Sequence, residues 1–269
     1  MFILFDVGGT KTRVTYSLDG QTIAEPVVEK TVHHSTDGPH HLISLIEKVA
    51  AGRHIASITG GIAGTLNAPQ TALSRSPNLS EWESYPIQST LSSHFQCPVH
   101  LENDSALVGL GEAHYGAGKD HDIVAYITVS TGVGGVRIVH GKIDINRFGF
   151  EPGHHIMDWE TKTTLESLVS GSANEERYQR NILELPPETW PKLAQQLAMG
   201  IYNASLFWSP DCIVLGGSMI VKEIGIDTQT VIEAYQTLPT VFNPGPAIVE
   251  ATLEDFGGLY GALAQAKFT

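Results

Sequence analysis

The sequence has 269 residues, of which 42% are hydrophobic, and its formal net charge is −13. This length is enough to bury a sizeable core and to form two domains. The negative charge argues against a nucleic-acid surface, and there is no basic stripe for a membrane. The N-terminal apolar run before Asp6 is too short for a signal peptide, and no segment reaches the ~20 apolar residues of a membrane span. We therefore expect a cytoplasmic protein.

The first part of the chain alternates between strand-like and helix-like patterns. Strands are expected near residues 2–6, 12–17, 22–28, 55–59 and 98–101, and helices near 40–51 and 86–95. In the first of these helices, Leu42, Ile46 and Val49 share one face. This alternation predicts an α/β layer with a mixed sheet.

A helix near 105–114 is expected to connect this layer to a second region. The second region has predicted strands near 123–129, 135–140 and 212–216, and predicted helices near 164–180 and 189–207. A last helix is predicted near 257–267. No low-complexity linker separates the two regions. We therefore expect two α/β domains, residues 1–112 and 113–255, with a hinge near 110–118.

Cysteines and histidines give weak signals by themselves. Cys97 and Cys212 lie far apart in strand-like runs, which favours buried, reduced thiols over a disulfide. Four histidines lie among polar residues and indicate an exposed loop rather than a metal site: His33, His34, His40 and His41.

A glycine turn follows the first predicted strand. The strand ends at Asp6, and Gly8, Gly9 and Thr10 separate it from a second strand. Adjacent glycines favour a tight hairpin because glycine reaches positive φ without steric cost. Such a turn also lets backbone N–H groups approach a phosphate. Asp6 is placed to hold a magnesium ion beside it.

The same pattern recurs after about half of the chain. A buried-strand run at 123–129 leads into Ser130, Thr131 and Gly132, and a return strand follows. Two related glycine turns that face each other would grip a polyphosphate from both sides. Neither turn matches the Gly-x4-Gly-Lys phosphate loop or the three-glycine dinucleotide fingerprint.

These two turns resemble the phosphate motifs of the ROK family of sugar kinases, which belongs to the actin-like, sugar-kinase superfamily. Further stretches occur in the same order as in that family: Gly64 with 76–82, 102–112, 151–154, 164–166, 170–171, 213–217 and 258–262. The resemblance therefore spans essentially the whole chain.

The resemblance implies an α/β, actin-like (ribonuclease H-like) ATPase fold, with two similar α/β domains and an interdomain cleft. It also implies that the C-terminal segment 256–269 packs back on the first domain. The implied function is ATP-dependent phosphorylation of a hexose, glucokinase- or hexokinase-like, at the 6-hydroxyl. ATP and Mg²⁺ are then required, and we expect a homodimer.

Asp104 is the candidate catalytic base in this resemblance. A hexose hydroxyl is a poor nucleophile, so phosphoryl transfer needs positioning, magnesium and a base near the hydroxyl. Asp104 also follows a strand and precedes a helix, so its alternative role is to cap that helix.

The resemblance assigns two further groups of residues. The implied sugar contacts are Asn78, Asn103, Asp104, Glu151, His154 and Glu166. The implied nucleotide and phosphate contacts are Asp6, Gly8, Gly9, Thr10, Lys11, Thr131, Gly132, Gly216 and Gly217, with magnesium held at Asp6 through water. Two alternatives stay open: Glu166 as a helix-surface charge, and Trp82 as either a sugar-stacking or a core residue.

Two departures from the family pattern stand out. Family members carry a cysteine-rich zinc segment after the Glu-x-Gly-His motif, whereas residues 156–163 contain no cysteine here. A closed structural zinc site needs about four N or S ligands, and we therefore expect no zinc. Ser130 stands where the family has glycine, so the local phosphate geometry is expected to differ.

The resemblance also allows functions other than a glucokinase-like activity. An N-acetylhexosamine or N-acetylmannosamine kinase is the alternative enzyme, and polyphosphate is an alternative donor. ROK members also include transcriptional repressors, so a non-catalytic sugar sensor is a further alternative. Those repressors carry a helix-turn-helix before the phosphate motif, which here begins at residue 2.

Overall fold

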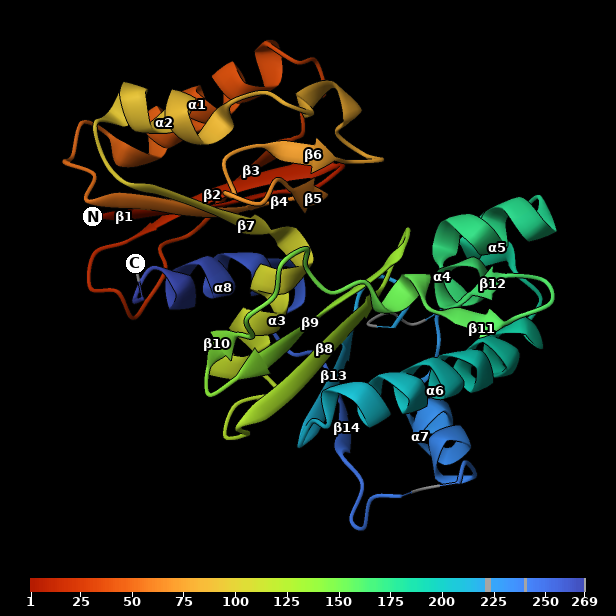
Figure 1. Cartoon of the computed structure of the whole chain (residues 1–269). Helices are drawn as coiled ribbons and strands as arrows, with labels where there is room; N and C mark the ends of the chain where they lie inside the picture. Colours follow the sequence, from red (N-terminus) through yellow and green to blue (C-terminus); the bar gives the residue numbers. More distant parts are fainter. Residues whose placement is uncertain (221–223, 240, 269) are drawn as a thin grey trace. The chain divides into compact units, whose positions relative to one another are not determined.

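The computed structural model describes residues 1–220, 224–239 and 241–268. The chain forms two compact units (Figure 1). Unit 1 comprises Met1–His114, Ile145–Gly149 and Asp255–Thr269, and unit 2 comprises Tyr115–Asp144 and Phe150–Glu254.

A mixed five-stranded sheet forms the centre of unit 1. Its strands, in the order β3-β2-β1-β4-β7, are β3 (Val27–Lys30), β2 (Lys11–Ser17), β1 (Phe2–Val7), β4 (Ser57–Ile62) and β7 (Val99–Asn103). The pairs β1–β2 and β2–β3 are antiparallel, whereas β1–β4 and β4–β7 are parallel. A small hairpin, β5 (Thr65–Leu66) and β6 (Leu73–Arg75), follows β4.

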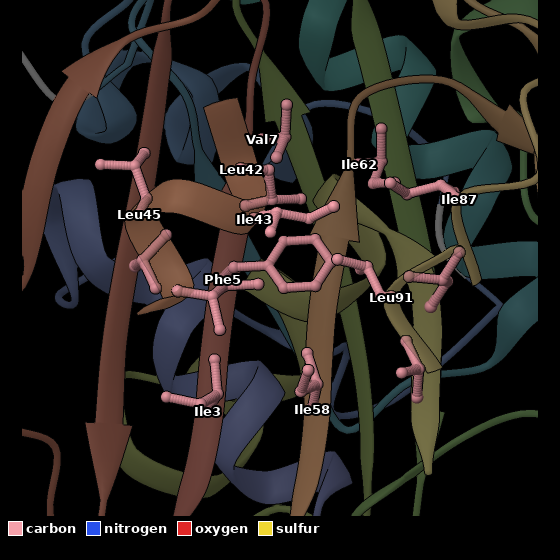
Figure 2. Packing of buried hydrophobic residues seen from close by; sticks show 14 of the residues in the cluster. Ile3, Phe5, Val7, Leu42, Ile43, Leu45, Ile58, Ile62, Ile87 and Leu91 are labelled. Carbon is pink, nitrogen blue, oxygen red and sulfur yellow. The ribbon is translucent and has the colours of Figure 1, made fainter. Parts of the chain in front are cut away.

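Helices cover both faces of this sheet (Figure 1). One face carries α1 (Asp37–Ala50) and α2 (Ile87–Phe95), and the other carries α3 (Asp104–Tyr115) and α8 (Gly257–Gln265). Successive side chains of a strand point to opposite faces. Ile3, Phe5 and Val7 of β1 therefore join the core beneath α1 and α2 (Figure 2). Asp6 points to the opposite face, which α8 covers.

Unit 2 repeats the sheet arrangement. Its order is β10-β9-β8-β13-β14, with β10 (Lys142–Ile143), β9 (Val133–Val139), β8 (Ile123–Val129), β13 (Cys212–Gly216) and β14 (Ala247–Glu250). The pair β8–β9 is antiparallel, and β8–β13 and β13–β14 are parallel. The two sheets thus share one topology, as the recurrent strand-turn-strand pattern predicts.

Helices and short segments complete unit 2. The helices are α4 (Leu165–Val169), α5 (Gly171–Tyr178), α6 (Thr189–Trp208) and α7 (Thr228–Gln236). A short hairpin pairs β11 (Ile156–Asp158) with β12 (Thr163–Thr164), directly after the 3-10 turn η2 (Pro152–His154). Leu165 of α4, Leu197 and Ile201 of α6, and Val231 of α7 pack with the β8 and β13 side chains in one core.

Three local predictions are wrong. The strand expected at 22–28 begins only at Val27, where pairing with β2 starts. The helix expected at 164–180 is broken at Ser170, which has an extended backbone and caps α5 by accepting from the Ala173 N–H. His40 and His41 lie in α1 rather than in a loop, because the helix already begins at Asp37.

The prediction of buried, reduced cysteines is confirmed. Both cysteines, which belong to the described part of the chain, are buried free thiols. Burial raises the pKa of Cys212 to about 11 and also raises that of Cys97. Among the described residues, no helix has the length and apolar character needed to cross a membrane.

Candidate active site

Asp6 and Asp104 lie at one edge of the unit 1 sheet. Asp6 is the penultimate residue of β1, and Asp104 begins α3 immediately after β7. Because β1, β4 and β7 run parallel, their carboxyl ends meet at the same edge. The structure therefore brings together the predicted magnesium residue and the predicted base.

Both carboxylates have raised pKa values. Burial, and next the negative charge of Asp104, raise the pKa of Asp6 to about 7, although the Arg13 guanidinium acts in the opposite direction. Burial also raises the pKa of Asp104, and hydrogen bonds from the Ser105 backbone and the Asn103 side chain partly offset this rise. This edge thus concentrates acidic groups away from water, where a cation is favoured.

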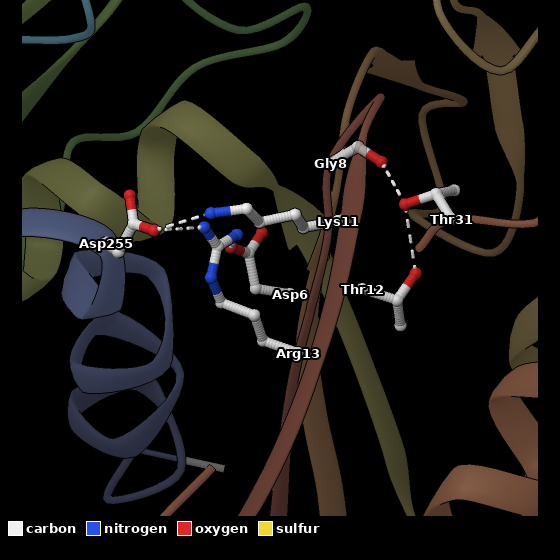
Figure 3. A network of polar contacts seen from close by, with 7 residues as sticks. All are labelled: Asp6, Gly8, Lys11, Thr12, Arg13, Thr31 and Asp255. Atoms are coloured by element: carbon white, nitrogen blue, oxygen red, sulfur yellow. Dashed lines mark hydrogen bonds and ion pairs between the residues drawn. The ribbon is translucent and has the colours of Figure 1, made fainter. Parts of the chain in front are cut away.

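Asp255 links the two basic residues next to this edge (Figure 3). Its Oδ2 lies 3.1 Å from Lys11 Nζ and 3.1 Å from Arg13 NH2, and Arg13 NH1 lies 3.3 Å from Asp6 Oδ2. The sequence did not single out Asp255 or Arg13 as site residues. The sequence marks Asp255 only as an acid shortly before the last predicted helix. Acids are common at helix N-termini, so this position alone does not indicate a site residue.

The glycine turn after β1 is held by its neighbours. Gly8 N–H donates to Lys11 O at 3.0 Å, and Thr31 Oγ1 donates to Gly8 O at 2.8 Å (Figure 3). Neither Gly8 nor Gly9 has a positive φ. The expectation that this turn needs glycine for its positive φ is therefore wrong. Gly9 is needed for close approach, since a Cβ there would lie 2.8 Å from Asn78 Cβ.

Asn103 connects the start of α3 to the Gly64 segment. Its Oδ1 accepts from the Ala106 N–H at 3.0 Å, so Asn103 caps α3. Its Nδ2 donates to Gly64 O at 2.9 Å and to Asp104 Oδ1 at 3.1 Å. Asp104 therefore follows the capping residue, and its carboxylate is oriented by Asn103.

Trp82 is a core residue. It is 2% exposed, and its Nε1 donates to Val32 O at 3.1 Å. An indole held in this way does not present a face for stacking on a sugar, which settles the alternative left open by the sequence.

In unit 2, Glu166 holds the turn between β8 and β9. Its Oε2 accepts from the Val133 N–H at 2.7 Å, and a Cβ on Gly132 would lie 2.7 Å from the same oxygen. Glu166 is therefore not an ordinary helix-surface charge. The glycine at 132 gives the carboxylate room to reach the turn.

The predicted nucleotide residues of unit 2 also come together. Thr131 and Gly132 follow β8, and Gly216 ends β13, whose residues pair in parallel with β8. Ser172 Oγ donates to Thr131 O at 2.6 Å, and Ser130 Oγ lies 2.9 Å from Ser218 Oγ. Gly217, beside Ser218, lies at the same edge.

Glu151 and His154 face each other across η2. Their Oε2 and Nδ1 atoms are 3.3 Å apart, and the side chains are 54% and 65% exposed. His155 Nδ1 contacts Pro152 O at 2.5 Å, and the Leu165 N–H donates to His155 O at 3.2 Å. These bonds tie η2 to α4, which carries Glu166.

The donor groups after η2 do not fit the family's zinc site. Residues 156–163 form the hairpin β11–β12, in which the Thr161 N–H donates to Asp158 Oδ1 at 2.9 Å and Lys162 Nζ lies 3.0 Å from the Trp159 ring centre. Within the described residues, no cluster of three or more His, Cys, Asp or Glu side chains suits a metal. The absence of zinc stays a prediction.

Residues 3–268 match the family model described as the ROK family. The chain belongs to the ROK family. The glucokinase of Thermotoga maritima is 28% identical over 179 residues, which cover 62% of this chain and 56% of that enzyme. The chain spans about half the length of the curated glucokinases it matches.

Solved structures agree with the family match. The ROK hexokinase from Thermus thermophilus has a TM-score of 0.84 at 25% identity, and the match covers 100% of this chain and 99% of that chain. A ROK family glucokinase from Streptomyces griseus, solved with glucose and AMPPNP, has a TM-score of 0.79 at 21% identity over 100% and 99% of the two chains. The predicted actin-like ATPase fold is confirmed. The glucokinase and hexokinase among these relatives agree with the predicted class of sugar kinase.

Proposed function

We propose that this ROK sugar kinase transfers the γ-phosphoryl group of ATP to the 6-hydroxyl of a hexose of the glucose type. The observation that carries the proposal is the environment of Asp104. Its carboxylate is held by Asn103 at 3.1 Å, at the sheet edge that also carries the glycine turn. A base and a phosphate turn at one edge are what phosphoryl transfer to a hydroxyl requires.

In the proposed reaction, Asp104 accepts the proton of the sugar hydroxyl while the hydroxyl oxygen attacks the γ-phosphorus of ATP, the bond to the bridging oxygen breaks and ADP leaves. A base works best when its pKa approaches the working pH, and burial raises the pKa of Asp104 in that direction. The bond from Asn103 Nδ2 to Oδ1 fixes the orientation of the carboxylate. The other oxygen is then the one proposed to receive the proton.

The donor phosphates are proposed to bind the two glycine turns. Backbone N–H groups of a tight turn, here Gly8–Thr10 in unit 1 and Thr131–Gly132 in unit 2, favour bound anions. Lys11 and Arg13 add positive charge near the first turn, and both are anchored on Asp255. Gly216 and Gly217 are proposed to lie near the adenosine.

Magnesium fits the acidic edge of unit 1. Mg²⁺ prefers hard oxygen ligands and keeps several waters. Asp6 would hold it through water. Burial and the Asp104 charge raise the pKa of Asp6 although Arg13 lies beside it, so a further cation would favour the charged carboxylate. The ion, when bound, neutralises charge on the transferred phosphoryl group.

Sugar recognition is assigned to planar hydrogen-bonding groups. Carboxylates accept from hydroxyls, and an imidazole N–H donates to one. In unit 1 the proposed contacts are Asn78 and Asn103, and in unit 2 they are Glu151, His154 and Glu166. The exposed Glu151–His154 pair is available to exchange its mutual contact for sugar hydroxyls.

A panel of sugars tests the proposal. Glucose, fructose, mannose, N-acetylglucosamine and N-acetylmannosamine are each incubated with Mg-ATP or polyphosphate, and ADP release and product phosphorus NMR are recorded. We expect ATP-dependent phosphorylation of glucose at the 6-position. Preference for an N-acetylated sugar would favour the alternative kinase, and sugar binding without turnover by folded protein would favour a sensor.

A further inference from the structure

The segment Thr31–His33, which directly follows β3, connects the glycine turn to the Asn78 segment. On the side of the turn, the Thr31 N–H donates to Thr10 O at 3.0 Å and Thr31 Oγ1 donates to Gly8 O at 2.8 Å. Thr31 is buried, and its hydroxyl also lies 3.1 Å from Thr12 Oγ1 (Figure 3). One end of the segment is thereby fixed to the phosphate turn.

The other end of the segment is fixed to residues 78–82. Val32 O accepts from the buried Trp82 indole at 3.1 Å. His33 Nδ1 lies 2.9 Å from Asn78 O, so the ring donates through Nδ1–H to this carbonyl. His33 and Asn78 are 45 residues apart in sequence, and both are exposed.

The backbone of Asn78 is held by a different hydrogen bond from those that hold the residues on either side of it. Ser76 is buried, with its Oγ donating to Ala63 O at 2.6 Å and accepting from the Leu79 N–H at 3.0 Å. These bonds fix the residues on either side of Asn78. The bond that reaches the Asn78 carbonyl comes from His33, and the Asn78 side chain rests against Gly9.

We propose that His33 is a positioning residue for the sugar: its imidazole holds the Asn78 backbone so that the Asn78 amide is presented beside the glycine turn. This inference rests on the proposed function, in which Asn78 contacts the sugar. Because Thr31 anchors the phosphate turn independently, loss of the His33 ring weakens sugar binding and leaves nucleotide binding nearly unchanged. The segment Thr31–His33 thereby fixes the position of Asn78 relative to the glycine turn.

Calorimetric titration with glucose tests the proposal without requiring turnover. One exposed hydrogen bond is worth enough to change an affinity by about 3–10-fold. His33→Ala is expected to weaken glucose binding by that factor, with the affinity for AMPPNP changed less than about twofold. His33→Asn, whose amide N–H takes the place of Nδ1–H, is expected to restore most of the glucose affinity.

The neighbouring His34 supplies a matched control. It is exposed like His33, but its Nδ1 contacts Thr36 Oγ1 at 3.2 Å and Asp37 Oδ2 at 3.5 Å, away from Asn78. His34→Ala is expected to bind glucose as the unaltered protein does. Thermal unfolding of all variants shows whether a change reflects a loss of fold.

The outcomes separate this inference from the proposed function. Glucose binding without turnover overturns the kinase proposal. The glucose affinities of the His33 and His34 variants then still test the positioning role of His33. The positioning role is overturned if His33→Ala binds glucose normally, if His34→Ala is equally impaired, or if His33→Asn gives no rescue. It is also overturned if glucose and AMPPNP affinities fall together, or if the unaltered protein binds no glucose.

Discussion

Asp6 and Arg13 are directly paired across β1 and β2, with Asp6 Oδ2 3.3 Å from Arg13 NH1. Both side chains are nearly buried, at 12% and 11% exposure, on the sheet face covered by α8. Arg13 also reaches Asp255, at the entrance to α8. The guanidinium thus joins the end of β1, which carries the phosphate turn, to the C-terminal segment of the same unit.

Removing this guanidinium should destabilise the protein. Arg13→Met leaves Asp6 in a buried site without its partner, and hydrogen bonds to charged groups are worth about 1.5–3 kcal/mol. We expect the free energy of unfolding in urea to fall by about that amount. Lys11→Met is the matched control because Lys11 also binds Asp255 but is 51% exposed, where such a pair is worth about 0–1 kcal/mol. Equal losses in both variants would contradict the structural role given to Arg13.

Asp104→Asn should remove the proposed base and keep the shape of the site. We expect kcat to fall by about 10²–10⁴-fold, with the dissociation constant for sugar nearly unchanged. Steady-state kinetics and calorimetry measure the two quantities. Asp19→Asn, at an exposed turn carboxylate, is the control and should keep normal turnover. Turnover at the normal rate by folded Asp104→Asn protein would sink the assignment.

Metal dependence should distinguish magnesium from zinc. A zinc-selective chelator is expected to leave the melting temperature unchanged, because the hairpin β11–β12 is held by its own hydrogen bonds and side-chain packing. Removal of magnesium is expected to abolish turnover, which magnesium alone should restore. Elemental analysis of the purified protein provides the check, since one zinc per chain would overturn this prediction.

The positions of Asp6 and Asp104 within the fold follow from short local patterns. An apolar run is followed by an acid, two glycines and a threonine. This pattern places Asp6 and the turn at the end of a strand independently of the rest of the fold. The same kind of pattern places Asp104 between strand β7 and helix α3, whereas its proposed role as base came from the family resemblance. Such patterns fix both the element and the position of the side chain within it.

The contacts that the sequence did not predict join segments that are distant along the chain. Lys11 and Asp255 are 244 residues apart, and His33 and Asn78 are 45 apart. The same limit explains Trp82, whose indole is buried by the Val32 carbonyl rather than by residues near it in sequence. Glu166 binds the Val133 N–H across 33 residues, which a helix-face pattern does not reveal.

Glu151 and His154 provide the sharpest test of sugar recognition. They are exposed and contact each other at 3.3 Å, so neither is needed to fill the core. Under the proposed function, losing either side chain leaves a sugar hydroxyl without its partner, at a cost of about 1–3 kcal/mol. Glu151→Ala and His154→Ala should each raise KM for sugar roughly 5–150-fold, with little change in KM for ATP.

A control for these variants comes from the adjoining hairpin. Glu160 is an exposed acid between β11 and β12, and Glu160→Ala should have normal kinetics for both substrates. Initial rates over a grid of sugar and ATP concentrations separate the two KM values. If the affinity for ATP falls as much as that for sugar in the Glu151 and His154 variants, η2 supports the local fold. Its link to α4 through His155 and Leu165 would then explain the loss better than direct contact with sugar.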